Sequence, residues 1–356
     1  MSPMFVPGPV DVDPQVLAAQ AEPMLPHRSK EFEQIFREAE NKARQVFFTQ
    51  NRVLISASSG TGLQEAAVRN FAKDSVLSCV NGAFAERWYD VAVSNGKTAA
   101  RVDAEWDQPI RSEMVAQAVR QKHYEMVTVV HNETSTGLQN PVQEIAAAVR
   151  EASPDTLICV DAVSSLAGAR LETDAWGLDM VLTSSQKCLA LPPGLGLAAI
   201  SDRALAYAEG VPNRGWYFDL VRLEKHRLKD STPATPAMSL IYALDMQLDR
   251  ILAEGLVERF ARHTAMAERV HRWAIERDQA LFAREGFRSH TVTTIVNRAD
   301  LDISALNKFL LGRDMRIANG YGKLKDKTFR IAHMGEIQLQ DIERLLLSLD
   351  EYMRPG

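Results

Sequence analysis

Short apolar segments alternate with amphipathic segments through the first two thirds of the chain. The apolar segments are expected to be buried strands at residues 52–55, 76–80, 126–130, 157–160, 180–183 and 197–200. Between several of them, apolar residues recur at the three-to-four spacing of a helix, at 64–71, 110–122 and 142–152. Continuous apolar strands separated by helices indicate a mostly parallel sheet that is covered by helices on both faces.

The pattern changes after about residue 230, where the sequence STPATP interrupts it. Beyond this point we expect helices at 303–311 and 339–352 and strands at 291–297 and 328–332. The prediction is an α/β fold in four parts: an N-terminal arm at 1–25, a large domain with the mostly parallel sheet at 26–236, a long connecting helical stretch at 237–275, and a smaller C-terminal α+β domain at 276–356. The prolines around Gly8 predict an extended arm, and Ser29 is the predicted N-cap of the helix that follows.

The composition excludes several classes of protein. The 356 residues carry a net charge of −5 at pH 7, so the chain lacks the basic surface that nucleic acid or an anionic membrane attracts. The sequence contains no apolar run long enough to span a bilayer, and its first residues lack the basic start and apolar core of a signal peptide. Three cysteines fit a reducing compartment better than a disulfide framework. We expect a cytoplasmic protein that acts on small molecules, without a nucleic-acid, membrane or metal partner.

Polar residues follow four of the predicted strands, and ligands of parallel sheets bind at the carboxyl ends of strands. The loop SASSGTG at 56–62 leads into a helix, whose free N–H groups would suit a phosphate. A plain turn with an N-cap is the alternative, since neither GxxxxGK[ST] nor GxGxxG is present. The loop HNETSTG at 131–137 has more hydrogen-bonding groups than a connection requires, although a polar surface loop would look the same.

The other two strand ends carry an acid and an amine. Asp161 follows the strand at 157–160, where a buried carboxylate needs a cation or hydrogen-bond donors; a capping or turn-forming Asp is the alternative. Lys187 follows the strand at 180–183 and precedes an apolar stretch, which would lower its pKa; an ordinary surface lysine is the alternative. Pyridoxal 5′-phosphate uses a lysine, an acid for its ring nitrogen and a phosphate-binding helix start. Lys187, Asp161 and the loop at 59–61 supply these groups in turn.

Eight motifs occur in a characteristic order along nearly the whole chain. They are PGP at 7–9, HRS at 27–29, SSGTG at 58–62, NGAF at 81–84, HNETSTG at 131–137, DAVSS at 161–165, SSQK at 184–187 with PPG at 192–194, and FRIAHMG at 329–335. In these motifs the chain resembles the class V aminotransferases of the fold-type I pyridoxal-phosphate enzymes, and most closely the alanine/serine–glyoxylate aminotransferase group. The resemblance implies a transaminase that moves an amino group from alanine or serine to glyoxylate or pyruvate by a ping-pong mechanism. It also implies a homodimer with shared active sites.

The resemblance implies roles for residues around the cofactor ring and the substrate. Lys187 would form the Schiff base and move the proton of the substrate, and Asp161 would hold the pyridine nitrogen. Phe84 would stack on the ring, and Ser135 would lie near the phenolic oxygen of the ring. Arg330 would bind the substrate carboxylate, because a planar guanidinium matches a carboxylate bidentately.

The resemblance implies further roles around the phosphate and in the arm. The phosphate ligands would be Ser59, Gly60 and Thr61, assisted by Gln186 and, across the dimer interface, by Thr235. Gly8 of the arm would let the backbone line the substrate site closely.

Relatives often have a tyrosine three or four positions before Thr235, where this chain has Ser231 and Thr232. This departure leaves one phosphate contact across the interface open.

Alternative functions remain open at this level. The donor could be another amine, such as 2-aminoethylphosphonate or ureidoglycine. A non-catalytic accessory subunit of the same fold is less favoured, because Lys187, Asp161 and Arg330 are all retained. A cysteine desulfurase is disfavoured, because no cysteine follows Cys188 to act as its nucleophile.

Overall fold

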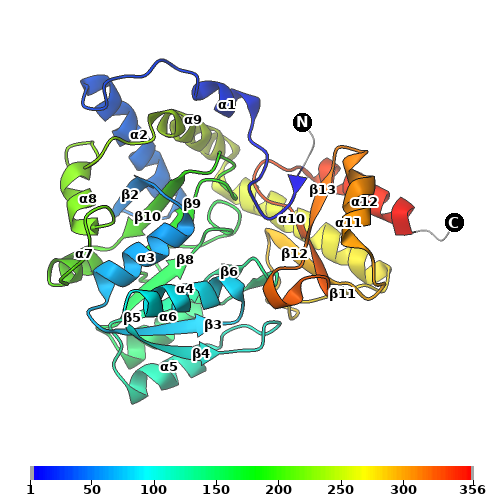
Figure 1. Cartoon of the computed structure of the whole chain (residues 1–356), viewed down its shortest axis with the longest axis horizontal. Coiled ribbons are helices and arrows are strands. Elements are labelled where there is room, and N and C mark those ends of the chain that lie inside the picture. Colours follow the sequence, from blue (N-terminus) through cyan, green and yellow to red (C-terminus); the bar gives the residue numbers. More distant parts are fainter. Residues whose placement is uncertain (1–3, 354–356) are drawn as a thin grey trace.

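The structure, a computed structural model, describes residues 4–353, and its larger part is built on a seven-stranded sheet (Figure 1). The strand order is β2-β10-β9-β8-β5-β3-β4. The strands are β2 (Arg52–Ala57), β3 (Ser75–Val80), β4 (Thr98–Asp103), β5 (Met126–Val130), β8 (Leu157–Asp161), β9 (Met180–Ser184) and β10 (Leu195–Ile200). The neighbours from β9 to β4 pair in parallel, whereas β10 is antiparallel to both β2 and β9. The prediction of a mostly parallel sheet is confirmed, with β10 as its antiparallel member.

Each apolar segment that was predicted as a strand of this sheet is a strand in the structure. The edge strand β4 was not predicted, because its sequence TAARVD is not an apolar run. Only Val102 among its side chains is buried, because β4 lies at the edge of the sheet. Its sequence therefore lacks the run of apolar residues that marks a buried strand.

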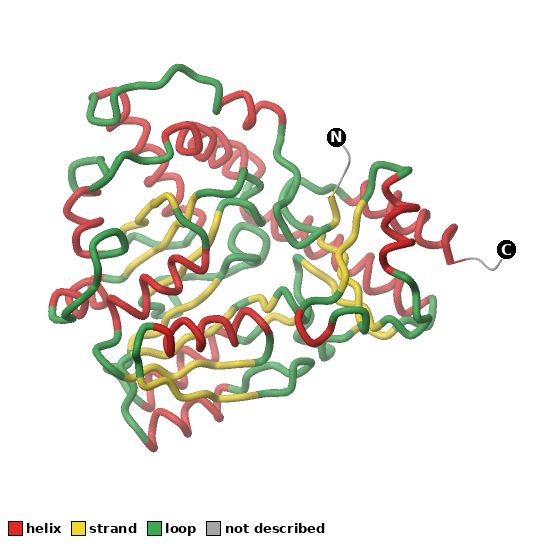
Figure 2. The backbone as a smooth tube through the Cα atoms, viewed as in Figure 1, coloured by secondary structure: helices red, strands yellow, loops and turns green. Residues whose placement is uncertain are grey.

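Helices cover both faces of this sheet, as the red and yellow segments of Figure 2 show. Side chains of successive strand residues point to opposite faces, so Val53 and Ile55 join one core and Leu54 joins the other. The first core is completed by α2 (Lys30–Val46), α5 (Ser112–Gln121), α6 (Val142–Ala152) and α9 (Met238–Glu254). The second is completed by α3 (Gly60–Phe71), α4 (Ala83–Ser94), α7 (Asp202–Glu209) and α8 (Leu220–Arg227).

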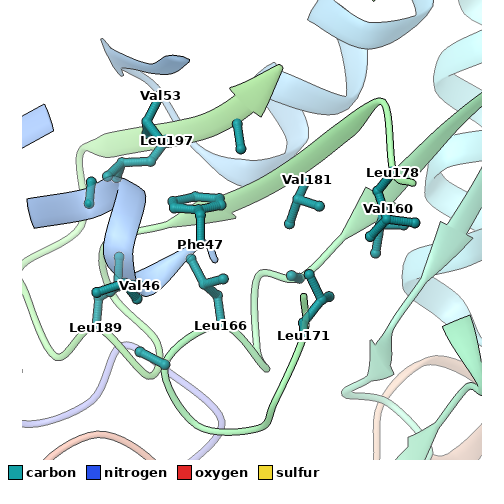
Figure 3. Close-up of a cluster of buried hydrophobic side chains, with 14 of the residues drawn as sticks. Val46, Phe47, Val53, Val160, Leu166, Leu171, Leu178, Val181, Leu189 and Leu197 are labelled. Atoms are coloured by element: carbon teal, nitrogen blue, oxygen red, sulfur yellow. The ribbon is translucent and has the colours of Figure 1, made fainter. Parts of the chain in front are cut away.

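Part of the first core is drawn in Figure 3, where Phe47 lies among aliphatic side chains such as Leu166 and Leu197. Phe47 directly follows α2, whose predicted N-cap is confirmed: the Ser29 hydroxyl accepts a hydrogen bond from the Phe32 N–H at 3.3 Å.

The helical stretch predicted at 237–275 consists of two helices, α9 and α10 (Leu256–Glu276). Gly255 separates them with φ +87°, a left-handed conformation that glycine adopts readily. Helix α9 packs on the larger sheet, whereas α10 packs on the smaller one.

The C-terminal part contains a smaller five-stranded sheet with the order β1-β13-β14-β12-β11. Its strands are β1 (Met4–Phe5), β11 (Ala280–Leu281), β12 (Val292–Val296), β13 (Arg316–Asn319) and β14 (Thr328–Ala332). Helices α11 (Ile303–Leu311) and α12 (Leu339–Met353) pack on it with α10. Two short elements complete the fold. Strands β6 (Asn132–Glu133) and β7 (Leu138–Gln139) form a hairpin, and a 3-10 turn, η1 (Gly322–Leu324), follows β13.

The N-terminal arm joins the two parts of the structure. Its first described residues, Met4 and Phe5, form β1, which pairs with β13 of the smaller sheet. Its helix α1 (Pro14–Ala19) packs against α9 on the larger part (Figure 1). The segment between β1 and α1, which contains Gly8, therefore crosses from one part to the other.

Within residues 4–353 no helix is long and apolar enough to cross a membrane. Over the same residues, no three His, Cys, Asp or Glu side chains gather closely enough to hold a metal ion.

Candidate active site

The loop after β2 ends in a capped helix start. The Ser59 hydroxyl accepts a hydrogen bond from the Gly62 N–H at 3.3 Å, and α3 begins at Gly60. A side chain at position 60 would collide with Val163, so only glycine fits there. The first N–H groups of a helix have no partner inside it and attract anions. The start of α3 can therefore receive a phosphate.

Asp161 is the last residue of β8, and its carboxylate is buried. Gln64 donates its Nε2–H to Oδ2 at 2.7 Å, and the Val163 N–H donates to Oδ1 at 2.8 Å. Burial raises the pKa of Asp161 above its usual value, although these hydrogen bonds oppose the shift. A carboxylate in such a position gains most from a cationic partner such as a protonated ring nitrogen.

Lys187 follows β9 by three residues, and its amine donates a hydrogen bond to the carbonyl of Pro7 in the N-terminal arm. Burial, and next the charge of Arg330, lower the pKa of Lys187 to about 8. A larger fraction of its amine is therefore neutral near pH 7 than in an exposed lysine, which makes it a better nucleophile and base.

Gly8 lies directly against this lysine. A Cβ on Gly8 would be 2.7 Å from the Lys187 Nζ, and the φ of +88° at Gly8 also favours glycine. The arm therefore closes one side of the site, and no larger residue fits at position 8.

The thiol next to Lys187 is inert. The Cys188 side chain is buried, donates to the carbonyl of Ser164 at 3.3 Å, and has its pKa raised by burial to about 12. A buried thiol with a raised pKa is a packing residue rather than a nucleophile.

Lys187 and Asp161 face one cavity of about 220 Å³. The predicted phosphate loop, the predicted ring-stacking residue and Gln186 line the same cavity. The full lining is Ser59, Gly60, Thr61, Gln64, Phe84, Arg87, Val130, Asn132, Thr134, Asp161, Val163, Ser184, Gln186 and Lys187. The structure thus brings together residues that lie up to 128 positions apart, from Ser59 to Lys187, in the sequence.

Three polar atoms in the lining suggest that the cavity takes a polar ligand. The Ser184 Oγ, the Gln64 Oε1 and the Asn132 Oδ1 are buried and have no hydrogen-bond partner within residues 4–353. Buried polar atoms are normally satisfied, because an unpaired one costs about 1–3 kcal/mol. A ligand that carries a phosphate, a hydroxyl and a ring nitrogen would provide partners, so the residues present fit pyridoxal phosphate.

Arg330 lies on β14, the central strand of the smaller sheet; it does not line the cavity itself but contacts Thr134, which does. Its Nε donates to the Asn319 carbonyl at 3.0 Å and its Nη1 to the Thr134 carbonyl at 3.2 Å. Burial lowers the pKa of Arg330 to about 10, so the group is still cationic at neutral pH. These two bonds fix the plane of the guanidinium, while its Nη2 has no hydrogen-bond partner in the described part of the chain.

Two predicted site residues lie away from the cavity. Ser135, predicted beside the phenolic oxygen, turns its hydroxyl to the Glu133 carboxylate at 2.6 Å, and the preceding residue, Thr134, lines the cavity instead. The role of Ser135 beside the phenolic oxygen stays a prediction, and Thr134 is a second hydroxyl of the same loop that faces the cavity. Thr235 lines a separate cavity of about 20 Å³ together with Thr232 and Tyr217. Thr235 could therefore contact a bound phosphate only in the active site of a second subunit.

Two polar residues of the lining, Gln64 and Arg87, lie outside every motif and were missed by sequence reasoning. Gln64 follows Gly60 by four residues on α3, and Arg87 follows Phe84 by three residues on α4. Residues three or four apart share a face of a helix, so the spacing from Gly60 and from Phe84 could have indicated both.

A buried acid, Glu133, was also missed. Its carboxylate accepts hydrogen bonds from the N–H groups of Phe84 and Ala85 at 3.2 and 3.1 Å, so it caps α4, which has no side-chain cap of its own. Burial raises the pKa of Glu133. Glu133 therefore sets the position of Phe84 at the cavity.

Comparisons with known proteins agree with this geometry. The family model described as Aminotransferase class-V matches residues 15–321. An uncharacterized aminotransferase of Methanocaldococcus jannaschii is 36% identical over 93% of this chain and 87% of its own length. The small subunit of a soluble hydrogenase of a Synechococcus strain is 34% identical over 98% and 91%. A serine–glyoxylate aminotransferase of Methylorubrum extorquens is 30% identical over 94% and 86%.

Solved structures show the same likeness over the whole chain. An aspartate aminotransferase of Thermus thermophilus has a TM-score of 0.91 at 31% identity and covers 98% of both chains. An alanine–glyoxylate aminotransferase of a Nostoc species has a TM-score of 0.93 at 28% identity and covers 99% of this chain and 96% of its own. The fold is that of the fold-type I aminotransferases, and the protein belongs to the class V aminotransferase family.

Proposed function

We propose that this aminotransferase binds pyridoxal 5′-phosphate and moves an amino group from alanine or serine to glyoxylate or pyruvate by a ping-pong mechanism. The observation that carries the proposal is the pairing of Lys187 and Asp161 in one cavity whose orphaned polar atoms call for a polar ligand. Pyridoxal phosphate, when bound, supplies an aldehyde that takes up the amine and a ring that withdraws electrons from the substrate α-carbon.

The residues of the chain divide the remaining work. The Asp161 carboxylate would keep a proton on the ring nitrogen, because its burial favours a cationic partner. The Lys187 amine, with its pKa near 8, would take the proton from the substrate α-carbon and return a proton later. Thr134 and Phe84 would orient the ring, and the start of α3 would hold the phosphate.

The identity of the donor is a proposal that rests on relatives named for serine and for alanine. Other donors, among them aspartate, 2-aminoethylphosphonate and ureidoglycine, remain alternatives. The experiment is a panel of amino acids added to the loaded enzyme, with the loss of the cofactor's visible absorption read as the first half-reaction. Alanine or serine should react fastest, and glyoxylate or pyruvate should restore the absorption. A faster reaction with any other donor would overturn the assignment.

We also propose a homodimer that shares its active sites, because Thr235 does not line the cavity of its own chain. The proposal of a cytoplasmic location rests separately on the free cysteines, which suit a reducing compartment. An accessory, non-catalytic subunit is the second candidate, since the Synechococcus relative is named as a hydrogenase subunit. The low pKa of Lys187 and the retained Arg330 argue against it, because a protein that only binds a partner needs neither. Absence of any half-reaction across the panel would favour the accessory role.

Replacing Arg330 with methionine should raise the KM for the amino acid about 100-fold, because a charge-assisted bidentate contact to the carboxylate is lost. The cofactor affinity should stay the same. Lysine at this position should restore only part of the loss, since it lacks the planar fork. Arg316, exposed on the neighbouring strand β13, provides the control, and Arg316→Met should leave the kinetics unchanged. Normal kinetics in Arg330→Met would contradict the assigned role.

A further inference from the structure

Arg87 is a second guanidinium in the cavity, and no role was assigned to it from the sequence. It lies on α4 and lines the same cavity as the loop at 59–61. Its Nη1 is 3.4 Å from the Thr61 Oγ1, at the start of α3. Figure 1 shows α3 and α4 side by side on the same face of the larger sheet. Arg87 therefore lies where the phosphate of the cofactor is proposed to bind.

Two neighbours hold the Arg87 side chain in this direction. Its Nη2 donates to the Tyr321 hydroxyl at 2.9 Å, and its guanidinium lies 4.9 Å from the centre of the Phe84 ring. The rings of Tyr321 and Phe84 are themselves stacked, with centres 5.2 Å apart. The side chain is thus oriented before any ligand binds, which reduces the entropy lost on binding.

The charge of Arg87 has no carboxylate partner within residues 4–353. Its hydrogen-bond partners there are the neutral hydroxyls of Thr61 and Tyr321. Its charge also acts on the cavity: it contributes to the lowered pKa of Lys187 and opposes the rise that burial causes in the pKa of Asp161. A guanidinium at the edge of a partly enclosed cavity is best satisfied by an anion.

The phosphate of the cofactor needs such a charge. It carries about −1.5 to −2 charges near neutral pH. The ligands assigned to it by resemblance, from Ser59 to Thr61 with Gln186 and Thr235, are all neutral, and the start of a helix contributes only about half a charge. A dianion held by neutral groups alone would be poorly compensated.

We propose that Arg87 is the charged ligand of the cofactor phosphate in this chain. The inference rests on the proposed function, since it requires that pyridoxal phosphate occupies the cavity. The planar guanidinium would supply a positive charge and N–H donors to the phosphate, and Tyr321 and Phe84 would hold it in place.

The test compares the affinities of the cofactor-free protein for pyridoxal phosphate and for pyridoxal, which lacks the phosphate. Arg87→Met should weaken the binding of pyridoxal phosphate by about 10- to 100-fold, the usual range for a lost hydrogen bond to a charged group. It should change the affinity for pyridoxal less than about 3-fold. Arg87→Lys should restore part of the loss, because it keeps the charge without the fork.

Arg101 on β4 provides a matched control. Its guanidinium also lies over an aromatic ring, 5.1 Å from the centre of Tyr89, but it does not line the cavity. Arg101→Met should leave both affinities unchanged. Thermal melting of each cofactor-free variant checks that the fold is retained.

Each other outcome has a distinct meaning. Equal losses for the two ligands would overturn the proposal and make Arg87 a support for the ring through Phe84. If Arg87→Met binds the cofactor normally and raises the KM of acidic donors only, the proposal is overturned, and Arg87 contacts the substrate instead. Failure of the unmodified protein to bind either ligand would overturn the proposed function itself, which the Arg87 variants alone cannot do.

Discussion

Replacing Lys187 with alanine should lower kcat by about 10⁴-fold or more, because one amine both binds the cofactor covalently and moves the substrate proton. The structure gives this amine a pKa of about 8 by burying it and placing Arg330 nearby. Among residues 4–353 no other lysine lines the cavity, so no neighbouring lysine there can take its place. The measurement is the single-turnover rate of the first half-reaction with alanine or serine.

Lys97 is a suitable control for this substitution. Like Lys187, its amine donates to backbone carbonyls, those of Ala72 and Lys73, and burial lowers its pKa. It lies next to β4, at the edge of the sheet away from the cavity. Lys97→Ala should keep full activity, and a small amine such as methylamine should restore part of the proton transfer in Lys187→Ala. Substantial activity of Lys187→Ala without added amine would contradict the assignment.

Replacing Asp161 with asparagine should lower kcat by about 10²- to 10⁴-fold and change the KM of the donor little. Asparagine keeps the size of the side chain but cannot hold a proton on the ring nitrogen through its charge, so the ring becomes a poorer acceptor of electrons. The measurement is the rate of proton abstraction from a donor deuterated at its α-carbon, compared with the undeuterated donor.

Asp179 is the matched control, because it is also a buried aspartate, placed just before β9 and hydrogen-bonded to the Ile158 N–H at the start of β8. It forms ion pairs with Arg150 at 3.0 Å and Arg203 at 2.7 Å and does not line the cavity. Asp179→Asn should therefore lower the thermal stability, since it removes the buried carboxylate with which two partly exposed arginines pair, but keep kcat. Asp161→Asn should do the reverse. Equal effects of the two substitutions on kcat would contradict a role of Asp161 at the ring.

Much of the larger sheet could be predicted from the sequence, because strands that are buried on both faces are continuous apolar runs. Strand β5 (Met126–Val130) and helix α6 (Val142–Ala152) have their predicted bounds. The half-exposed strands β4 and β13 have no such run, and their formation depends on pairing with a neighbour. Gly255 marks the break between α9 and α10 in the sequence. The apolar residues on both sides keep a helical spacing, so the sequence pattern alone did not show that the helix is interrupted there.

The site could be predicted where a motif fixes the backbone, and less well where the direction of a side chain matters. Lys187, Asp161 and the loop at 59–61 lie around one cavity because the ends of parallel strands meet at one edge of a sheet. The loop at 131–137 has hydroxyl side chains at three successive positions, 134–136. Only the backbone conformation of the loop shows that Thr134, and not Ser135, lines the cavity. The spacing from Phe84 could have placed Arg87 on the cavity side of α4. The direction of its guanidinium also depends on a hydrogen bond to the Tyr321 hydroxyl, 234 positions away, which sequence spacing cannot show.

The most direct test of the central claim is to reduce the loaded enzyme with borohydride, digest it and map the peptide that carries the cofactor. The account predicts that the visible absorption band disappears and that the added mass lies on Lys187, in the peptide that contains SSQK. The same treatment of Lys187→Ala should leave no label. A label on any other lysine, or none in a protein that still transaminates, would contradict the account.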